Sequence, residues 1–184
     1  IITINGMDDI TLDCRGHAIA GGRKGIDIVA SDNILVKNCN IRKMANGIII
    51  ERFSENIKII NNIFENNAVS IRIQDSFNNM IENNEITRMS KNVTTGTRRL
   101  VLNSINNFGI IINNGMNNTI RNNIIVRHAK GLYLYSGKEN SIENNYIDSA
   151  DYGIDVLLNS DDNKSSTRTN FPFSYSKTTF KPSI

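Results

Sequence analysis

Aliphatic and polar residues alternate along short stretches of this chain, as in Ile26-Asp27-Ile28 and Ile57-Lys58-Ile59. A period of two is the pattern of a half-buried β-strand. Isoleucine, which is β-branched, dominates these stretches, and no segment outside them keeps a helical stripe of apolar residues. The hydrophobic pattern therefore predicts an all-β protein built from many short strands.

These strands recur at a fixed interval. Each repeat starts with a small residue, then an aliphatic residue, any residue and a second aliphatic residue. The small residues are Gly25, Gly47, Ser70, Gly109, Gly131 and Gly153. Successive starts are 22, 23, 39, 22 and 22 residues apart. A constant period of this size is typical of a solenoid, so we predict a single-stranded parallel β-helix of about seven coils, each of about 22 residues.

Asparagine-rich corners separate the strands. Pairs of asparagines occur at one position of the repeat, at Asn61-Asn62, Asn83-Asn84, Asn122-Asn123 and Asn144-Asn145. Asparagine tolerates the left-handed backbone of a sharp corner, and its amide can bond the nearby backbone. Amides stacked in register can also bond from coil to coil as a ladder. The chain has 31 Ile and 30 Asn, so we expect isoleucine to fill the interior and asparagine to turn the corners.

The 39-residue interval interrupts the repeat. Its excess lies in residues 87–108, which we predict to be a loop inserted into the third coil. Long insertions in a regular scaffold are common places for binding sites.

The periodicity is lost after residue 158, so we predict a β-helix over 1–158 and a polar C-terminal tail or cap over 159–184. The chain begins at Ile1 in a strand-like pattern, so a processed chain or a fragment without its N-terminal cap is expected.

Charge is distributed unevenly along the chain. Residues 86–138 contain no Asp or Glu but eight basic residues, which leaves −5 (3 − 8) for the rest of a chain whose net charge is +3. The eight are Arg88, Lys91, Arg98, Arg99, Arg121, Arg127, Lys130 and Lys138. This asymmetry favours an anionic partner at the middle coils, although solvated basic residues that cluster by chance give the same pattern. A nucleic acid suits the charge but not the predicted fold.

The outward positions of the repeated strand carry a mixture of side chains. The residue between the two aliphatics forms one column: Asp27, Ile49, Arg72, Ile111, Tyr133 and Asp155. The next outward residue forms a second: Val29, Glu51, Gln74, Asn113, Tyr135 and Leu157. Tyr133 and Tyr135 suit a platform on which sugar rings stack. The alternative is that the inserted loop covers these two rings.

The segment Asp9-Ile10-Thr11-Leu12-Asp13-Cys14-Arg15-Gly16-His17-Ala18-Ile19 resembles the N-terminal motif of the NosD-like right-handed β-helix proteins. These are part of a wider set of carbohydrate-binding and sugar-hydrolase β-helices that includes pectate lyases, polygalacturonases and mannuronan C5-epimerases. The resemblance of the repeats covers roughly residues 2–158. It implies a right-handed parallel β-helix located outside the cell, on its surface or in the periplasm. The same coil supports many activities, so the resemblance alone does not select one.

The resemblance implies three kinds of chemistry that can be compared with the residues present. A copper role needs clustered ligands, but His17, His128 and the two cysteines have no metal-ligand spacing. Polygalacturonase-like hydrolysis uses several Asp on neighbouring coils, whereas the paired Asp161-Asp162 lies in the predicted tail. Calcium serves many lyases of this fold, but residues 21–27 are similar to a calcium-binding nonapeptide only once and in a different register. We therefore predict no metal or other cofactor.

Tyr152-Gly153-Ile154-Asp155-Val156-Leu157 is similar to the mannuronan epimerase signature Tyr-Gly-Phe-Asp-Pro-His, whose Tyr, Asp and His are catalytic. The last two positions differ, so the catalytic His is missing, and glycine followed by alternating aliphatics is also this chain's own repeat. Proton abstraction beside a carboxylate needs a cation, a base and an acid. The 22-residue period places Tyr133 beneath Asp155 and Lys130 beneath Tyr152.

The candidate catalytic residues are Tyr152, Asp155, Tyr133, Lys130 and His128, and the candidate substrate-binding residues are Arg72, Arg88, Lys91, Arg98, Arg99 and Tyr135. We predict an extracellular or surface protein that binds an acidic polysaccharide through a basic middle section of the helix. The alternative is a polysaccharide lyase or C5-epimerase that acts on uronate polymers. The chain lacks the run of about 18 apolar residues that spans a membrane. Cys14 and Cys39 lie at corners of adjacent coils, where they either form a disulfide or, as the favoured interpretation, remain two buried free thiols.

Overall fold

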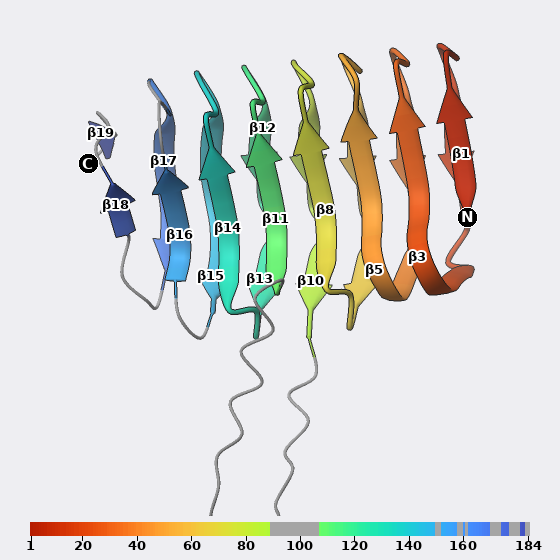
Figure 1. The fold of residues 1–184 in the computed structure, drawn as a ribbon. Coiled ribbons are helices and arrows are strands. Elements are labelled where there is room, and N and C mark those ends of the chain that lie inside the picture. Colours follow the sequence, from red (N-terminus) through yellow and green to blue (C-terminus); the bar gives the residue numbers. More distant parts are fainter. Residues whose placement is uncertain are drawn as a thin grey trace, which may run out of the picture.

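The computed structural model describes residues 1–88, 107–149, 152–157, 160, 162–169, 174–176 and 181–182. Every described element is a β-strand, and the strands stack in parallel as a right-handed β-helix of about seven coils (Figure 1). The predicted fold class is therefore confirmed. No helix in these ranges is long and apolar enough to cross a membrane.

A complete coil contributes strand segments to three faces, which we number in chain order. Face 1 contains β2 (Thr11–Asp13), β4 (Leu35–Lys37), β6 (Lys58–Ile60), β9 (Met80–Glu82), β12 (Thr119–Arg121) and the first parts of β15 (Ser141–Asp148) and β17 (Lys164–Thr169). Face 2 contains the first parts of β3 (Ala18–Val29) and β5 (Asn40–Glu51), then β7 (Ile63–Glu65), β10 (Glu85–Thr87), β13 (Ile124–Val126) and the end of β15.

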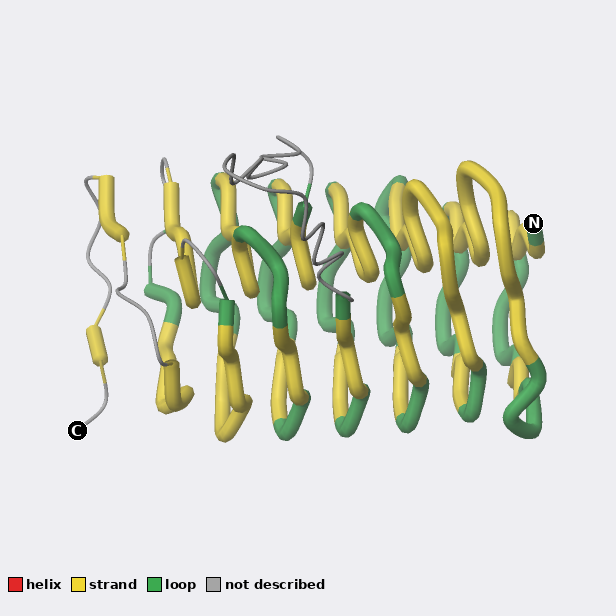
Figure 2. The backbone as a smooth tube through the Cα atoms, turned by 90° about the horizontal axis from the view of Figure 1, so that it is seen from below, coloured by secondary structure: helices red, strands yellow, loops and turns green. Residues whose placement is uncertain are grey.

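Face 3 carries the candidate site. It contains β1 (Ile2–Asn5), the second parts of β3 and β5, and then β8 (Val69–Gln74), β11 (Phe108–Asn113), β14 (Lys130–Tyr135), β16 (Tyr152–Leu157) and β18 (Ser174–Ser176). These strands form the front row of arrows in Figure 1, and Figure 2 shows the same coils from below.

Strand register follows the sequence period. Ile26, Ile48, Ile71, Ile110, Leu132 and Ile154 pair in succession from coil to coil, and all six are completely buried. Burial of one such side chain stabilises the fold by about 1.5–3 kcal/mol. Glycine precedes most of these residues because a Cβ on Gly109 would lie 2.5 Å from the carbonyl oxygen of Gly131 in the next coil. The interior is thus a stack of aliphatic residues, as the pattern predicted.

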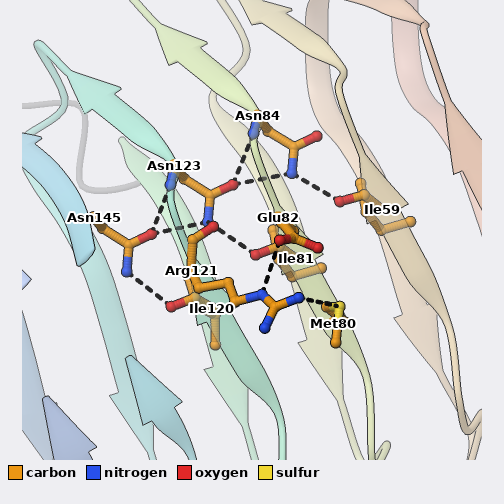
Figure 3. A network of polar contacts seen from close by, with 9 residues as sticks. All are labelled: Ile59, Met80, Ile81, Glu82, Asn84, Ile120, Arg121, Asn123 and Asn145. Atoms are coloured by element: carbon orange, nitrogen blue, oxygen red, sulfur yellow. Dashed lines mark hydrogen bonds and ion pairs between the residues drawn. The ribbon is translucent and has the colours of Figure 1, made fainter. Parts of the chain in front are cut away.

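The corner between faces 1 and 2 holds stacked asparagines. The first residue of each pair, such as Asn83 or Asn122, has a left-handed backbone, and the second is buried. Asn84 Nδ2 donates to Asn123 Oδ1 at 3.0 Å, and Asn123 Nδ2 donates to Asn145 Oδ1 at 2.9 Å (Figure 3). A second row of the same kind, which the sequence analysis did not identify, lies between faces 3 and 1: Asn79, Asn118, Asn140 and Asn163.

Cys14 and Cys39 form a disulfide, with a Cα–Cα distance of 4.7 Å. The favoured prediction of two free thiols is therefore wrong. Stacking of adjacent coils brings these corner residues within the range that a disulfide spans. Cys39 is buried and Cys14 is partly buried, so the bridge ties the first two coils together beside the interior.

The inserted segment begins after β10, which ends at Thr87, and precedes β11, which starts at Phe108. Residues 89–106 lie outside the described residues. Beyond residue 158, β17 pairs in parallel with β15, β18 pairs with β16, and β19 (Lys181–Pro182) pairs with β17. The described parts of 159–184 thus continue the parallel pairing of the coils, while the domain boundary at 158 stays a prediction.

Candidate functional site

The outer surface of face 3 carries three columns of side chains. The first outward column has the predicted order, because Asp27, Ile49, Arg72, Ile111, Tyr133 and Asp155 pair in succession. A further column lies on the side nearer face 2 and consists of Lys24, Asn46, Val69, Phe108, Lys130 and Tyr152. Ile49, Ile111 and Asp155 are buried although they point away from the interior. The outer surface of this face is therefore closely packed.

Four of the five candidate catalytic residues gather on β14 and β16. Lys130 Nζ lies 2.6 Å from Asp155 Oδ2 and 4.7 Å from the centre of the Tyr133 ring. The same ammonium lies 5.7 Å from the ring centres of both Tyr152 and Phe108. We call these five residues the Lys130 cluster. Phe108 is not among the residues predicted from the sequence, although it lies 22 residues before Lys130 in the same register.

Within the Lys130 cluster, the positive charge of Lys130 is balanced by the carboxylate of Asp155. Burial raises the pKa of Tyr133; the neighbouring carboxylate of Asp155 and Tyr135 add to this, while Lys130 opposes it. Tyr133 therefore keeps its proton at neutral pH, so it is in the wrong protonation state to act as a general base. Asp155 balances the charge of Lys130, so this ammonium is less available to neutralise a substrate carboxylate.

His128, the fifth candidate catalytic residue, is fully buried at the corner between faces 2 and 3. Its Nδ1 bonds Asn107 Oδ1 at 3.0 Å. Burial lowers the pKa of His128 to about 3, and the nearby positive charge of Arg88 adds to this effect. The imidazole is therefore neutral and inaccessible to a ligand on the outer surface of face 3.

Arg72 occupies the centre of the first outward column, between the buried side chains of Ile49 and Ile111. It takes part in none of the ion pairs formed by the described residues. Its Nε is buried and has no hydrogen-bond partner. A half-buried cation without a counter-ion, flanked by apolar side chains, is an arrangement suited to an anionic group from outside.

The remaining candidate binding residues are placed as follows. Tyr135 is half-buried beside Asn113 on face 3. Arg88 is half-buried at the end of β10, where its Nη1 has no partner and burial lowers its pKa. Lys91, Arg98 and Arg99 lie outside the described residues.

The acid-free segment does not form one basic face among the described residues. Arg121 lies on face 1 and pairs with Glu82 at 2.9 Å (Figure 3). Arg127 lies at the corner before face 3, and Lys138 at the corner after it. Between Ile86 and Lys138 the described chain passes once around the helix axis and then crosses face 3 a second time, so residues close in sequence point in different directions. Acidic residues from neighbouring coils then balance part of the charge.

Four buried polar atoms on the outer surface of face 3 have no hydrogen-bond partner: Asp27 Oδ1, Asn46 Oδ1, Arg72 Nε and Asn113 Oδ1. Native proteins leave few buried polar groups without a hydrogen bond, so these four atoms are unusual. Three of these atoms are acceptors and one is a donor. Because these atoms are buried, an external ligand reaches only the exposed parts of the same side chains.

Two solved structures show the same fold. The periplasmic alginate epimerase AlgG matches with a TM-score of 0.73 and 17% sequence identity, over 98% of this chain and 46% of that chain. The enzymatically active domain of tailspike protein 2 from bacteriophage CBA120 matches with a TM-score of 0.63 and 11% identity, over 90% of this chain and 27% of that chain. This chain thus spans less than half the length of either protein. At these identities the likeness concerns the fold alone.

Sequence comparison assigns the family. A search of curated protein sequences gave no significant match. The family model described as "Periplasmic copper-binding protein (NosD)" matches residues 2–165, which is most of the chain. Its parallel β-helix and the N-terminal motif at residues 9–19 agree with this match. The chain therefore belongs to the NosD family.

Proposed function

We propose that this protein binds a carboxylated polysaccharide on the outer surface of face 3. The observation that carries the proposal is Arg72, a half-buried guanidinium with no acidic partner among the described residues. Guanidinium and carboxylate groups form paired, charge-assisted hydrogen bonds. The buried side chains of Ile49 and Ile111 on either side lower the local dielectric constant and strengthen such a pair.

The neighbouring groups suit the rest of a sugar chain. Tyr133 and Tyr135 offer aromatic surface against which the apolar side of a sugar ring packs. Coils repeat at about 4.8 Å along the helix axis, which is close to the length of one sugar unit in an extended glycan. A chain that lies along the axis would thus meet one coil with each sugar.

The charges of face 3 refine the expected ligand. Lys24 pairs with Asp27 at 2.7 Å and with Glu51 at 3.7 Å, and Lys130 pairs with Asp155 at 2.6 Å, so both lysines have acidic partners. Arg72 is then the cation left for a ligand among the described residues of this surface. A polysaccharide with carboxylates at intervals fits better than one with a carboxylate on every sugar. Lys91, Arg98 and Arg99 remain predicted contributors from the inserted segment.

Two further observations support the proposal. AlgG, whose fold this chain shares, is named as an epimerase of alginate, which is a polysaccharide. Disulfides persist in oxidising compartments, and the family is described as periplasmic. We therefore place the protein in the periplasm or outside the cell, where such polymers occur.

The family description also implies copper, and the described residues do not fit a copper centre. The two thiols are joined in a disulfide, so neither is available as a thiolate ligand. His17 Nδ1 hydrogen-bonds the backbone carbonyl of Cys14. His128 is buried and lies several coils away from His17. Within the described ranges, no group of three or more His, Cys, Asp or Glu side chains is arranged to hold a metal ion.

The experiment compares binding of alginate, pectate, partly esterified pectin and a glycosaminoglycan by affinity electrophoresis. We expect Arg72→Ala to weaken binding at least tenfold. Arg42→Ala, which removes an exposed arginine from face 2, is the matched control and should bind like the native protein. Equal binding by Arg72→Ala and native protein would contradict the proposal.

A second candidate function is a lyase or C5-epimerase acting on uronate, because Lys130, Tyr133, Tyr152 and Asp155 do lie together. The raised pKa of Tyr133 and the Lys130–Asp155 ion pair weigh against it. Incubation with the same polymers, followed by ultraviolet detection of unsaturated products and NMR detection of epimerisation, tests it. Turnover that Tyr133→Phe abolishes would favour the enzyme, and absence of turnover by the native protein would exclude it for these polymers.

A further inference from the structure

A second irregularity of the repeat lies at the corner between faces 3 and 1. The interval from Gly47 to Ser70 is 23 residues, one more than the interval before it. The extra residue falls at Arg52-Phe53, where both residues have a left-handed backbone with φ of 59° and 62°. At the same corner of the next coil a single left-handed residue, Asp75, is sufficient before the buried serine.

Phe53 is an unusual residue for this position. Bulky side chains rarely adopt positive φ, because Cβ then crowds the following carbonyl oxygen. The strain is not offset by burial, since Phe53 remains 69% exposed. Strained, exposed positions of this kind are common at ligand-binding sites.

Phe53 belongs to a ridge of apolar side chains. Its ring centre lies 6.1 Å from that of Phe77 on the next coil, and Phe77 pairs with Met116 one coil further along. Met116 is 41% exposed. A shallow groove of about 300 Å³ runs beside them, lined by Glu55, Phe77, Asn78, Met116, Asn117 and Glu139. Phe53 and this groove together form what we call the corner groove.

The polar groups of the corner groove are mainly acceptors. Asn117 Nδ2 donates to Asn78 Oδ1 at 2.6 Å, and Asn78 Nδ2 donates to Glu55 Oε2 at 3.4 Å. One N–H of each amide is thus used within the row. The carboxylates of Glu55 and Glu139 line the groove, and Lys138 pairs with Met116 beside it, so the groove has no excess of positive charge that would attract a polyanion.

We propose that the corner groove is a separate site for uncharged sugar units, and that a neutral hexose oligosaccharide is its ligand. Aromatic rings pack against the C–H side of such sugars, while their hydroxyl groups donate to carboxylates. The lack of an unpaired cation in its lining distinguishes this site from Arg72 on face 3, which suits an anionic ligand. The proposal stands on its own contacts and does not depend on the function proposed for face 3.

The test uses NMR of protein labelled with ¹³C at its methionine methyl groups. Hexamers of glucose, mannose and galactose are the neutral probes, and an oligogalacturonate hexamer is the anionic probe. We expect the Met116 signal to shift saturably with at least one neutral hexamer and not with the anionic one. The signal of Met44, which is buried, is the internal control and should stay constant.

Three variants complete the test. Phe77→Ala should weaken neutral-sugar binding at least tenfold. Phe53→Asn keeps a residue that tolerates the left-handed backbone, so it should retain the melting temperature within a few degrees and weaken binding severalfold. Arg72→Ala should leave this binding unchanged, which separates the two sites. No Met116 shift with any neutral hexamer, or an equal shift with the anionic hexamer, would overturn the proposal.

Discussion

Lys130 on β14 reaches the carboxylate of Asp155 on the next coil, with Nζ and Oδ2 only 2.6 Å apart. Asp155 is almost fully buried, and three aromatic rings surround the ammonium group. The pair therefore joins two coils on their outer side, in addition to the aliphatic stack inside. Its geometry leads to the first prediction.

Lys130→Met should lower the free energy of unfolding by about 3 kcal/mol, because it removes the cation that lies 2.6 Å from the buried carboxylate of Asp155. Urea denaturation followed by circular dichroism measures this change. Lys138→Met replaces an exposed lysine of the same coil and should change stability by less than about 0.5 kcal/mol. Similar stability of both variants would show that the ion pair does not hold the coils together.

Asn123→Ala should destabilise the protein by about 3 kcal/mol, because the amide of Asn123 bonds Asn84 below it and Asn145 above it in a buried row. The neighbouring Asn122→Gly is the control: this residue is exposed and left-handed, and glycine adopts that backbone freely. Its effect should stay within about 0.5 kcal/mol. Equal losses from the two variants would argue against the row as a source of stability.

Reduction of the Cys14–Cys39 disulfide should lower stability by about 2–4 kcal/mol. Thermal unfolding with and without dithiothreitol measures the loss as a lower melting temperature. The double variant Cys14→Ser, Cys39→Ser should melt near the reduced native protein and should not respond to the reductant. A native protein that is indifferent to dithiothreitol would contradict a bridge between the first two coils.

Acid should destabilise the protein through His128. Its pKa in the folded state is about 3, against an ordinary value of 6.5, because burial disfavours the charged ring. The unfolded chain therefore binds a proton first as the pH falls below 6.5, and stability drops progressively until the folded state also binds one near pH 3. Asn67 occupies the equivalent corner two coils earlier, so His128→Asn should fold and should show a smaller loss between pH 6.5 and 4 in urea denaturation. An unchanged pH dependence would assign the acid sensitivity to other groups.

The repeat period predicted contacts unusually well because a solenoid converts sequence spacing directly into neighbours. Tyr133 beneath Asp155 and Lys130 beneath Tyr152 followed from a spacing of 22 residues, and both pairs are observed. The ion pair between Lys130 and Asp155 was not predicted, because it runs diagonally and depends on side-chain length and conformation. The same spacing of 22 residues places Phe108 beneath Lys130, but Phe108 was not predicted as a site residue.

Charge was harder to predict than register. The acid-free stretch suggested one basic surface, yet Arg121 and Lys130 lie on different faces and each has an acidic partner from outside the stretch. Net charge along a sequence becomes a surface property only where the chain stays on one side of the molecule. The guanidinium of Arg72, by contrast, has no acidic partner among the described residues, and only the three-dimensional structure shows which partners lie near a side chain.

The asparagine rows also show how the scaffold responds to its insertion. Asn84 and Asn123 are 39 residues apart, and Asn123 and Asn145 are 22 apart, yet the two amide-to-amide hydrogen bonds measure 3.0 and 2.9 Å. The coils therefore close identically whether or not extra chain leaves between Thr87 and Phe108. This position is therefore suited to the insertion of other peptides or small domains, because the stacking of the β-helix coils does not depend on the length of the inserted segment.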